Sequence, residues 1–158
     1  MRRFTPVELA VGVALLGSVA AVAVPAFVRE LHSSHHVEAT AGLARLASGA
    51  LSYAEANQHF PESAPLTPAV PPRGKKEADP PGTWDGPTWT ALGFRAAPED
   101  VPHAYSFAFD STGTSFVARA RGDLDGDGIL STFEVRGVAR VDEPAHLEPG
   151  MYVEAELE

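Results

Sequence analysis

The chain has 158 residues, enough for one domain, and 44% of them are hydrophobic, which excludes wholesale disorder. Twelve Lys and Arg residues against 21 Asp and Glu residues give a net charge of −9, which argues against a nucleic-acid binder. The absence of cysteine excludes a disulfide framework, a thiolate nucleophile, a thiolate zinc site and an iron–sulfur cluster.

The negative charge lies after residue 30, because residues 1–30 carry three arginines against two glutamates. Residues 9–28 contain no charged side chain, and a helix of that length spans about 30 Å, the hydrocarbon thickness of a bilayer. Arg2 and Arg3 precede this run, so the positive-inside rule keeps the N-terminus cytoplasmic and sends the acidic remainder outward. The alternatives are a buried helix of a soluble protein and a conventional signal peptide cleaved after Ala21-Val22-Ala23.

The residues at the start of this run follow a specific pattern. Phe4-Thr5-Pro6-Val7-Glu8 precedes the apolar residues, and Pro25 lies late among them. This segment resembles the N-terminus of type IV pilins and of the pseudopilins of type II secretion. In those families a short basic leader precedes a phenylalanine, and a glutamate is the fifth residue of the mature chain. This sequence departs from the family at Arg3, where the family has glycine, and at Pro6-Val7, which replaces a Leu-Ile pair.

The resemblance implies a leader of residues 1–3 that a prepilin peptidase removes, with cleavage between Arg3 and Phe4 and N-methylation of Phe4. It also implies that Glu8 and Pro25 belong to an assembly helix, residues 4–30, that packs against other pilin-like subunits. Glu8 would pair with the terminal ammonium of a neighbouring subunit, or alternatively lie at the membrane interface and snorkel. The implied location is a single pass of the inner membrane with a periplasmic head, followed by a filament in the periplasm or at the cell surface.

Residues 31–60 continue as an amphipathic helix, which gives one helix from about Thr5 to Asn57 with a bend at Pro25. Three histidines at helical spacing, either sharing a metal or forming a hydrated collar, are His32, His35 and His36. The expected buried stripe is Val37, Ala41, Ala44, Ala47 or Leu51, and Ala54, with Leu43, Leu46 and Ala50 beside it.

Residues 61–87 hold eight of the 14 prolines and are expected to form a loop without regular structure. The aromatic residues that follow predict a packed cluster that anchors the loop on the helix, with a ligand cage as the alternative: Trp84, Trp89, Leu92 and Phe94. In the head, residues 88–158, alternating patterns predict strands at 104–109, 115–121, 132–141 and 151–157. Their short connections predict an antiparallel sheet, so the fold class is α+β, with a long N-terminal helix packed on the sheet. This is also the pilin architecture.

The strongest chemical motif lies in residues 123–134. Its acidic and glycine residues match the calcium-loop template, in which hard oxygen ligands alternate along the chain. The flanks resemble strands rather than the helices of an EF-hand, so the last ligand has the alternative of pointing elsewhere. An ion-free Asp/Gly-rich turn is the other interpretation, and magnesium fits less well than calcium. The predicted ligands are Asp123, Asp125, Asp127, the carbonyl of Ile129, and Glu134.

The sequence contains no nucleophile elbow, no phosphate-binding P-loop and no His-Glu-x-x-His zinc motif, so we expect no enzymatic activity. The first functional hypothesis is a minor pilin or pseudopilin of a type IV pilus or type II secretion-like filament. The alternative is a secreted calcium-binding module that a conventional signal peptidase releases.

Overall fold

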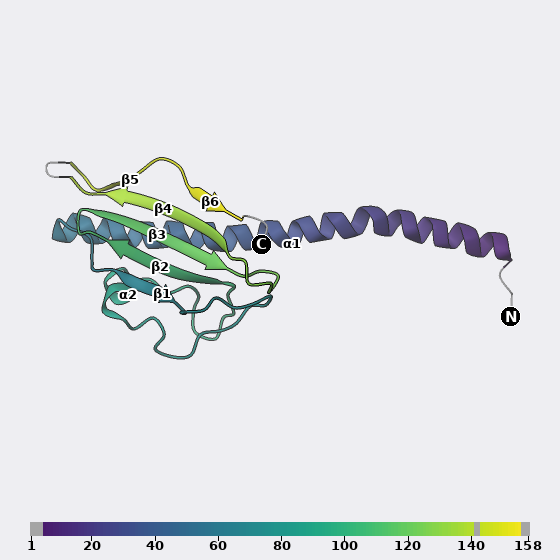
Figure 1. Cartoon of the computed structure of the whole chain (residues 1–158), viewed down its shortest axis with the longest axis horizontal. Helices are drawn as coiled ribbons and strands as arrows, with labels where there is room; N and C mark the ends of the chain where they lie inside the picture. Colours follow the sequence, from purple (N-terminus) through teal and green to yellow (C-terminus); the bar gives the residue numbers. More distant parts are fainter. Residues whose placement is uncertain (1–4, 141–142, 156–158) are drawn as a thin grey trace. The chain divides into compact units, whose positions relative to one another are not determined.

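The computed structural model describes residues 5–140 and 143–155, without the side chains of residues 26–35. Arg3 and Phe4, and the side chains of His32 and His35, therefore lie outside the described residues. The chain divides into two compact units, Met1–His35 and His36–Glu158. The elements in chain order (Figure 1) are α1 (Pro6–Asn57), β1 (Ala64–Thr67), α2 (Pro87–Ala91), β2 (Tyr105–Ser111), β3 (Ser115–Gly122), β4 (Ser131–Val138), β5 (His146–Leu147) and β6 (Tyr152–Glu154).

The first unit contains the N-terminal part of α1, and no side chain described there, from residue 5 to residue 25, is buried. The stretch Pro6–Pro25 is long and apolar enough to cross a membrane, and none of it is buried. Val7, Leu16 and Val22 are each more than 70% exposed. The predicted apolar helix is therefore confirmed, and its composition is that of a membrane anchor or a signal sequence. Pro25 lies inside the helix, as expected.

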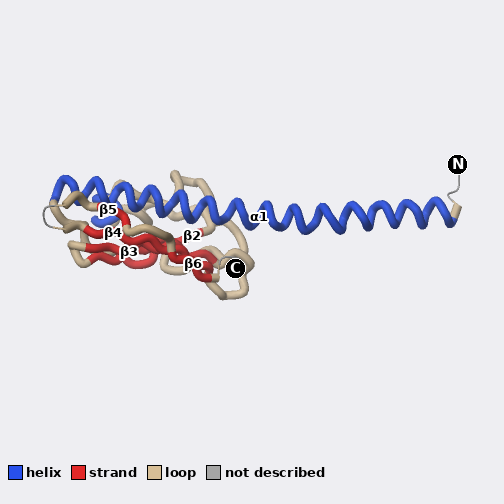
Figure 2. Tube along the Cα trace, turned by 90° about the horizontal axis from the view of Figure 1, so that it is seen from above, coloured by secondary structure: helices blue, strands red, loops and turns tan. Residues whose placement is uncertain are grey.

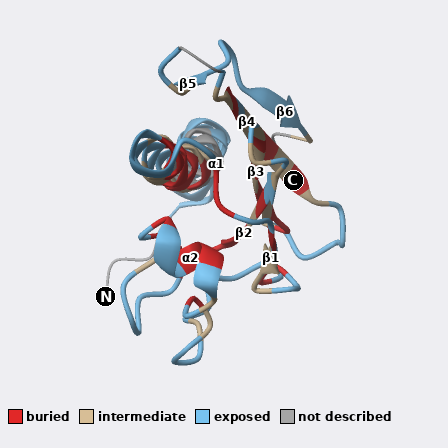
Figure 3. Cartoon of the chain, turned by 90° about the vertical axis from the view of Figure 1, so that its left-hand side faces the viewer, coloured by how far each residue is buried: buried red, intermediate tan, exposed pale blue. Residues whose placement is uncertain are grey.

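In the second unit, the C-terminal part of α1 covers one face of the sheet (Figures 2 and 3). The expected boundary of the helix is confirmed, because it ends at Asn57, where Gln58 adopts a positive φ of 64° and donates its N–H to the Ala54 carbonyl. The face of α1 that packs on the sheet is buried at spacings of three and four: Ala39, Leu43, Leu46, Ala47, Ala50 and Ala54.

This buried face differs from the expected stripe. Val37 is 65% exposed, and Ala41 and Ala44 are exposed as well, whereas the residues expected beside the stripe form its centre. Two leucines, Leu43 and Leu46, decide the orientation, because each buries more apolar area than an alanine. Of the expected stripe, Ala47 and Ala54 are buried, so the prediction is correct for its second half and wrong for its first.

The sheet is antiparallel throughout, in the order β1-β2-β3-β4-β5, with β6 also paired to β4. The α+β class and the four predicted strands are confirmed. Three elements were not expected: β1, which lies within the proline-rich loop, the short helix α2, and β5. β1 has only four residues and pairs with β2 through Ala64–Phe109 and Thr67–Phe107, so partners far along the chain stabilise it.

The aromatic residues after the loop are part of the core rather than a ligand cage. Trp84, Trp89 and Phe94 are 3–7% exposed, and the ring centroids of Trp84 lie 5.1 Å from Trp89 and 5.5 Å from Phe94. The same segment is fastened to α1, because Arg45 donates to the Ala96 carbonyl over 2.6 Å and lies over the Phe94 ring. The expected anchoring of this segment on the helix is thus observed.

Candidate functional site

The acidic loop connects β3 to β4 and brings three of the predicted ligands together. Each of Asp123, Asp125 and Asp127 offers one carboxylate oxygen, and these oxygens lie within 4.8 Å of one another. Asp123 follows the last residue of β3 and is 2% exposed, whereas Asp125 and Asp127 are exposed. Three carboxylates this close repel one another, which a bound cation would relieve.

Backbone amides fold the loop around its own carboxylates. Oδ1 of Asp123 accepts N–H bonds from Gly126 at 2.9 Å and Gly128 at 3.4 Å. Oδ1 of Asp125 accepts from Asp127 at 3.0 Å, and Oδ1 of Asp127 accepts from Ile129 at 2.7 Å. Gly126 and Gly128 have φ of 86° and 96°, a conformation that glycine adopts without strain. The three carboxylates are therefore held in place by the loop itself.

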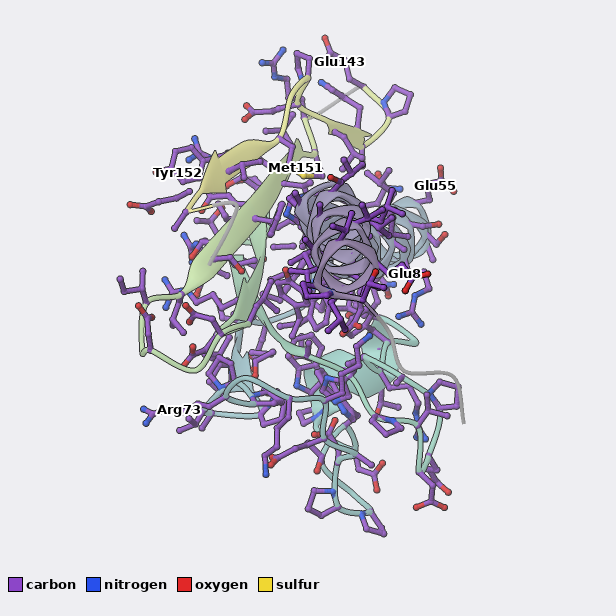
Figure 4. The ribbon with its side chains drawn as sticks, turned by 90° about the vertical axis from the view of Figure 1, so that its right-hand side faces the viewer. Glu8, Glu55, Arg73, Glu143, Met151 and Tyr152 are labelled. Carbon is purple, nitrogen blue, oxygen red and sulfur yellow. The ribbon has the colours of Figure 1, made fainter. Side chains whose placement is uncertain are left out.

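The second oxygen of Asp123 has a different environment. Oδ2 is buried and has no hydrogen-bond partner. Its nearest cation is Nε of Arg73, at 3.6 Å, on a side chain that is 68% exposed and that projects from the edge of the head (Figure 4). A buried carboxylate oxygen without a hydrogen bond is costly. The cluster therefore has the donor set for a hard cation, with one buried oxygen that accepts no hydrogen bond.

Arg73 is a member of this site that the sequence did not predict. The loop that carries it is bound to the acidic loop, because the Gly74 N–H donates to the Asp123 carbonyl over 2.8 Å and Arg73 forms a backbone bridge with Asp123. Fifty positions separate the two residues in the chain. No local pattern in the sequence could have indicated this contact.

Glu134 does not join the three aspartates. It lies on β4 opposite Arg119 of β3, and its oxygens accept hydrogen bonds from Arg119 at 2.8 Å and from Arg136 at 2.5 Å. Burial acts to raise the pKa of Glu134, but hydrogen bonds from Arg136 and Arg119 outweigh it and hold the pKa below its usual value. A strand carries the chain straight away from the loop, whereas the helix after an EF-hand loop returns its last ligand to the ion.

Ile129, the predicted carbonyl ligand, lies at the exposed end of the loop with its side chain 53% exposed. Its amide is already used by Asp127. Within the described residues, the structure thus gathers the aspartates of the motif and places Glu134 in an arginine pair.

At the other end of the chain, Glu8 takes part in the N-terminal cap of α1. Its Oε2 accepts the Thr5 N–H at 2.8 Å and the Thr5 hydroxyl at 3.0 Å, and the Glu8 N–H donates back to Thr5 Oγ1 over 3.3 Å. This reciprocal pattern is a capping box, with Pro6 at the first helical position, where a missing N–H costs nothing. The Thr-x-x-Glu spacing is visible in the sequence, so this role of Glu8 was predictable and was missed.

Comparisons with known proteins add no relative: no family model, no curated protein and no solved structure matches this chain.

Proposed function

We propose that this chain is a structural subunit of the pilin type, a minor pilin or pseudopilin, rather than an enzyme. The main support for the proposal is the contrast in burial between the two parts of α1. One helix, Pro6–Asn57, begins with a 20-residue apolar stretch that is nowhere buried and ends with a face that is the core of an antiparallel head. The first part needs a membrane or neighbouring helices to cover it, and the second part needs neither.

In this proposal the subunit starts in the inner membrane with its head outside the cytoplasm, and it enters a type IV pilus or a type II secretion-like filament through α1. Prepilin peptidase would remove residues 1–3 before assembly. Other pilin-like subunits would cover the exposed apolar side chains of Pro6–Pro25. Glu8 supports this role because both of its cap contacts use Oε2, and a carboxylate has further acceptor positions for a neighbour's terminal ammonium.

N-terminal sequencing of the exported protein tests the class. A start at Phe4, or an intact leader in the membrane fraction, is expected for a filament subunit. A start at Val24 would instead identify a secreted module released by a signal peptidase, and the filament proposal would then be wrong.

Substitutions at Glu8 test the assembly role, and the capping box dictates their choice. Glu8→Gln keeps the hydrogen bonds of the cap but removes the charge, whereas Thr5→Ala removes the cap and keeps the charge. We expect both variants to stay membrane-inserted. Glu8→Gln should be depleted from purified filaments, measured by quantitative immunoblotting against the membrane fraction, while Thr5→Ala should be incorporated nearly as well as wild type. The reverse order would show that Glu8 serves only the cap.

We further propose that the acidic loop binds calcium, with Asp123, Asp125 and Asp127 as its side-chain ligands. The specific observation is the buried Oδ2 of Asp123, which lacks a hydrogen bond beside two carboxylates. Calcium accepts six to eight oxygen ligands in flexible geometry, so carbonyls or water would complete the site. Glu134 is not required, because two arginines already bind it.

Thermal unfolding of the full chain in detergent tests the calcium site. An ion that binds only the folded form stabilises it by about 2.7 kcal/mol at a hundredfold excess over Kd, so the melting temperature should rise by several degrees between chelator and calcium. Asp125→Ala should abolish this difference, and magnesium should reproduce little of it. Glu134→Gln should retain the calcium response. Equal melting curves with calcium and with chelator would show that the loop is only a turn.

A further inference from the structure

A buried histidine outside both regions has an unusual set of hydrogen bonds. His103 lies two residues before β2 and is 3% exposed. Its Nδ1 is 2.8 Å from the Tyr105 carbonyl oxygen, and its Nε2 is 2.7 Å from Oδ2 of Asp79. A neutral imidazole carries one N–H and can donate to only one of these acceptors, whereas an imidazolium donates to both. Both contacts are hydrogen bonds only when each ring nitrogen carries a proton.

The partner carboxyl group receives a second hydrogen bond on the same oxygen. Oδ2 of Asp79 also accepts the indole N–H of Trp84 at 2.5 Å, and the Asp79 side chain is 14% exposed. A carboxylate accepts both donors on one oxygen. With a proton on each nitrogen of the His103 ring, this contact would be a buried ion pair.

This pair fastens a long loop to the sheet. Residues 77–84 follow Lys75 and Lys76 and end at Trp84, which packs on Trp89 and Phe94. The backbones of Glu77 and His103 exchange two hydrogen bonds, of 3.0 Å and 2.9 Å. Asp79 lies between these two attachments, so the loop is held by a backbone bridge, by the contact of Asp79 with His103 and by the packed indole of Trp84.

We propose that His103 and Asp79 form a proton-dependent clasp that holds loop 77–84 on the sheet. When the imidazolium loses a proton, either its Nε2 turns a lone pair toward the Asp79 carboxylate or its Nδ1 turns one toward the Tyr105 carbonyl. In both cases one hydrogen bond is replaced by a repulsive contact in a buried place, and the loop loosens. The clasp is therefore closed at low pH and weakens as the pH rises.

The charged groups around the pair favour the closed form. A void of about 20 Å³ next to His103, large enough for one water molecule, is lined by Asp85, Arg95 and Glu99 as well as by Asp79. Arg95 is engaged by Glu99 at 3.4 Å. On the neighbouring α1, Glu38 accepts the Ala104 N–H and binds Lys76, each over 2.6 Å, and Glu77 pairs with Lys75 at 2.7 Å. Each nearby cation thus has its own carboxylate, which leaves Asp79 to the imidazolium.

The test uses the full chain in detergent micelles and two nuclear magnetic resonance measurements. Ring ¹⁵N shifts of His103 report whether one or both nitrogens carry protons. Hydrogen exchange at the Glu77 and His103 amides, corrected for the intrinsic effect of pH, reports loop opening, with the Phe109 and Ala118 amides inside the sheet as internal reference. From about pH 6 to about pH 9 we expect the two loop amides to accelerate about tenfold relative to the reference.

Two variants and one control make the result specific. His103→Gln cannot titrate, and Asp79→Asn removes the carboxylate at constant size, so each should abolish the pH response of the loop amides. His146→Gln, at an exposed position on β5, should leave it intact. A single protonated ring nitrogen at about pH 6, or a pH response that survives in Asp79→Asn, would overturn the clasp. The clasp lies within the head, so its failure would leave the filament and calcium proposals untouched.

Discussion

At the level of single residues, the carboxylates of the predicted calcium motif have different hydrogen-bond and ion-pair partners. Asp123, Asp125 and Asp127 face one another, whereas Glu134 faces Arg119 and Arg136. The aspartates accept hydrogen bonds from amides of their own loop, and a bound cation would relieve the repulsion between them. Glu134 is held by guanidinium groups, so its energy depends on its own ionisation.

Glu134→Gln should therefore destabilise the head in a pH-dependent way. Glu134 is 7% exposed, and removing its charge leaves two arginines with a weaker acceptor, for which we expect a loss of about 1–3 kcal/mol at neutral pH. Because the pKa of Glu134 is lowered in the folded state, this contribution is fully present above the ordinary value of 4.5. It is lost as the pH falls through the lowered pKa. Denaturant unfolding of both proteins across this range checks the prediction.

Glu55→Gln is the matched control for this experiment. Glu55 lies exposed on α1 (Figure 4) and forms no ion pair within the part of the chain that the structure describes. Its substitution should change the free energy of unfolding by no more than about 0.5 kcal/mol at any pH. A pH-independent loss at Glu134 would mean that packing rather than charge is responsible.

The sequence predicts those residues of this site that lie close together in the chain, but not their partners from distant segments. The three aspartates lie within five positions, and their convergence follows from the loop itself. The partner of Glu134 is Arg119, which depends on the register of β3 and β4, and the partner of Asp123 is Arg73, fifty positions away. Neither partner follows from the motif, so the contact of Glu134 with two arginines could not be predicted from it.

At the level of elements, two glycines set how closely α1 approaches the rest of the head. A Cβ on Gly42 would overlap the Phe107 ring, and a Cβ on Gly49 would overlap the Leu92 carbonyl oxygen. The two lie seven positions apart, about two helical turns, so they form a notch along the side of α1 that meets β2 and the segment after α2.

Gly49→Ala should destabilise the head although alanine is the better helix former. The intrinsic gain is about 1 kcal/mol, whereas forcing a methyl group against a backbone oxygen costs about 1–3 kcal/mol and shifts the backbone. We expect a lower melting temperature of the full chain in detergent. The exposed Ser48→Ala, one position earlier, should change stability by no more than about 0.5 kcal/mol. Stabilisation by Gly49→Ala would show that α1 moves freely against the segment after α2.

The elements that the sequence predicts correctly are those whose hydrophobic pattern extends over many residues. The helix from residue 6 to 57 and the strands β2, β3 and β4 each show a sustained apolar period, and their bounds are close to the expected ones. β1, α2 and β5 have four, five and two residues. Such short elements form because the sheet edge and the aromatic cluster stabilise them, and that context is not visible in a local window.

At the level of the whole molecule, the two units differ in the burial of their side chains as strongly as they differ in charge. Every buried hydrophobic residue in the described part of the chain lies between Ala39 and Phe133, in the second unit. After residue 30 the chain carries nine basic and 19 acidic residues, so this part has a strong net negative charge, which favours solubility. The first unit contributes a helix whose Pro6–Pro25 stretch is nowhere buried.

A chain that begins at His36 should therefore fold without the first unit. It retains every residue of the core, including Phe133 and the His36 ring that contacts it at 5.7 Å. We expect it to be soluble without detergent and to melt within a few degrees of the full chain in micelles, measured by circular dichroism. Leu43→Ala in this shorter chain should lower the free energy of unfolding by about 2–5 kcal/mol, which verifies that melting reports the core. An unfolded or aggregated chain from His36 onward would show that the apolar part of α1 is needed to fold the head as well as to anchor it.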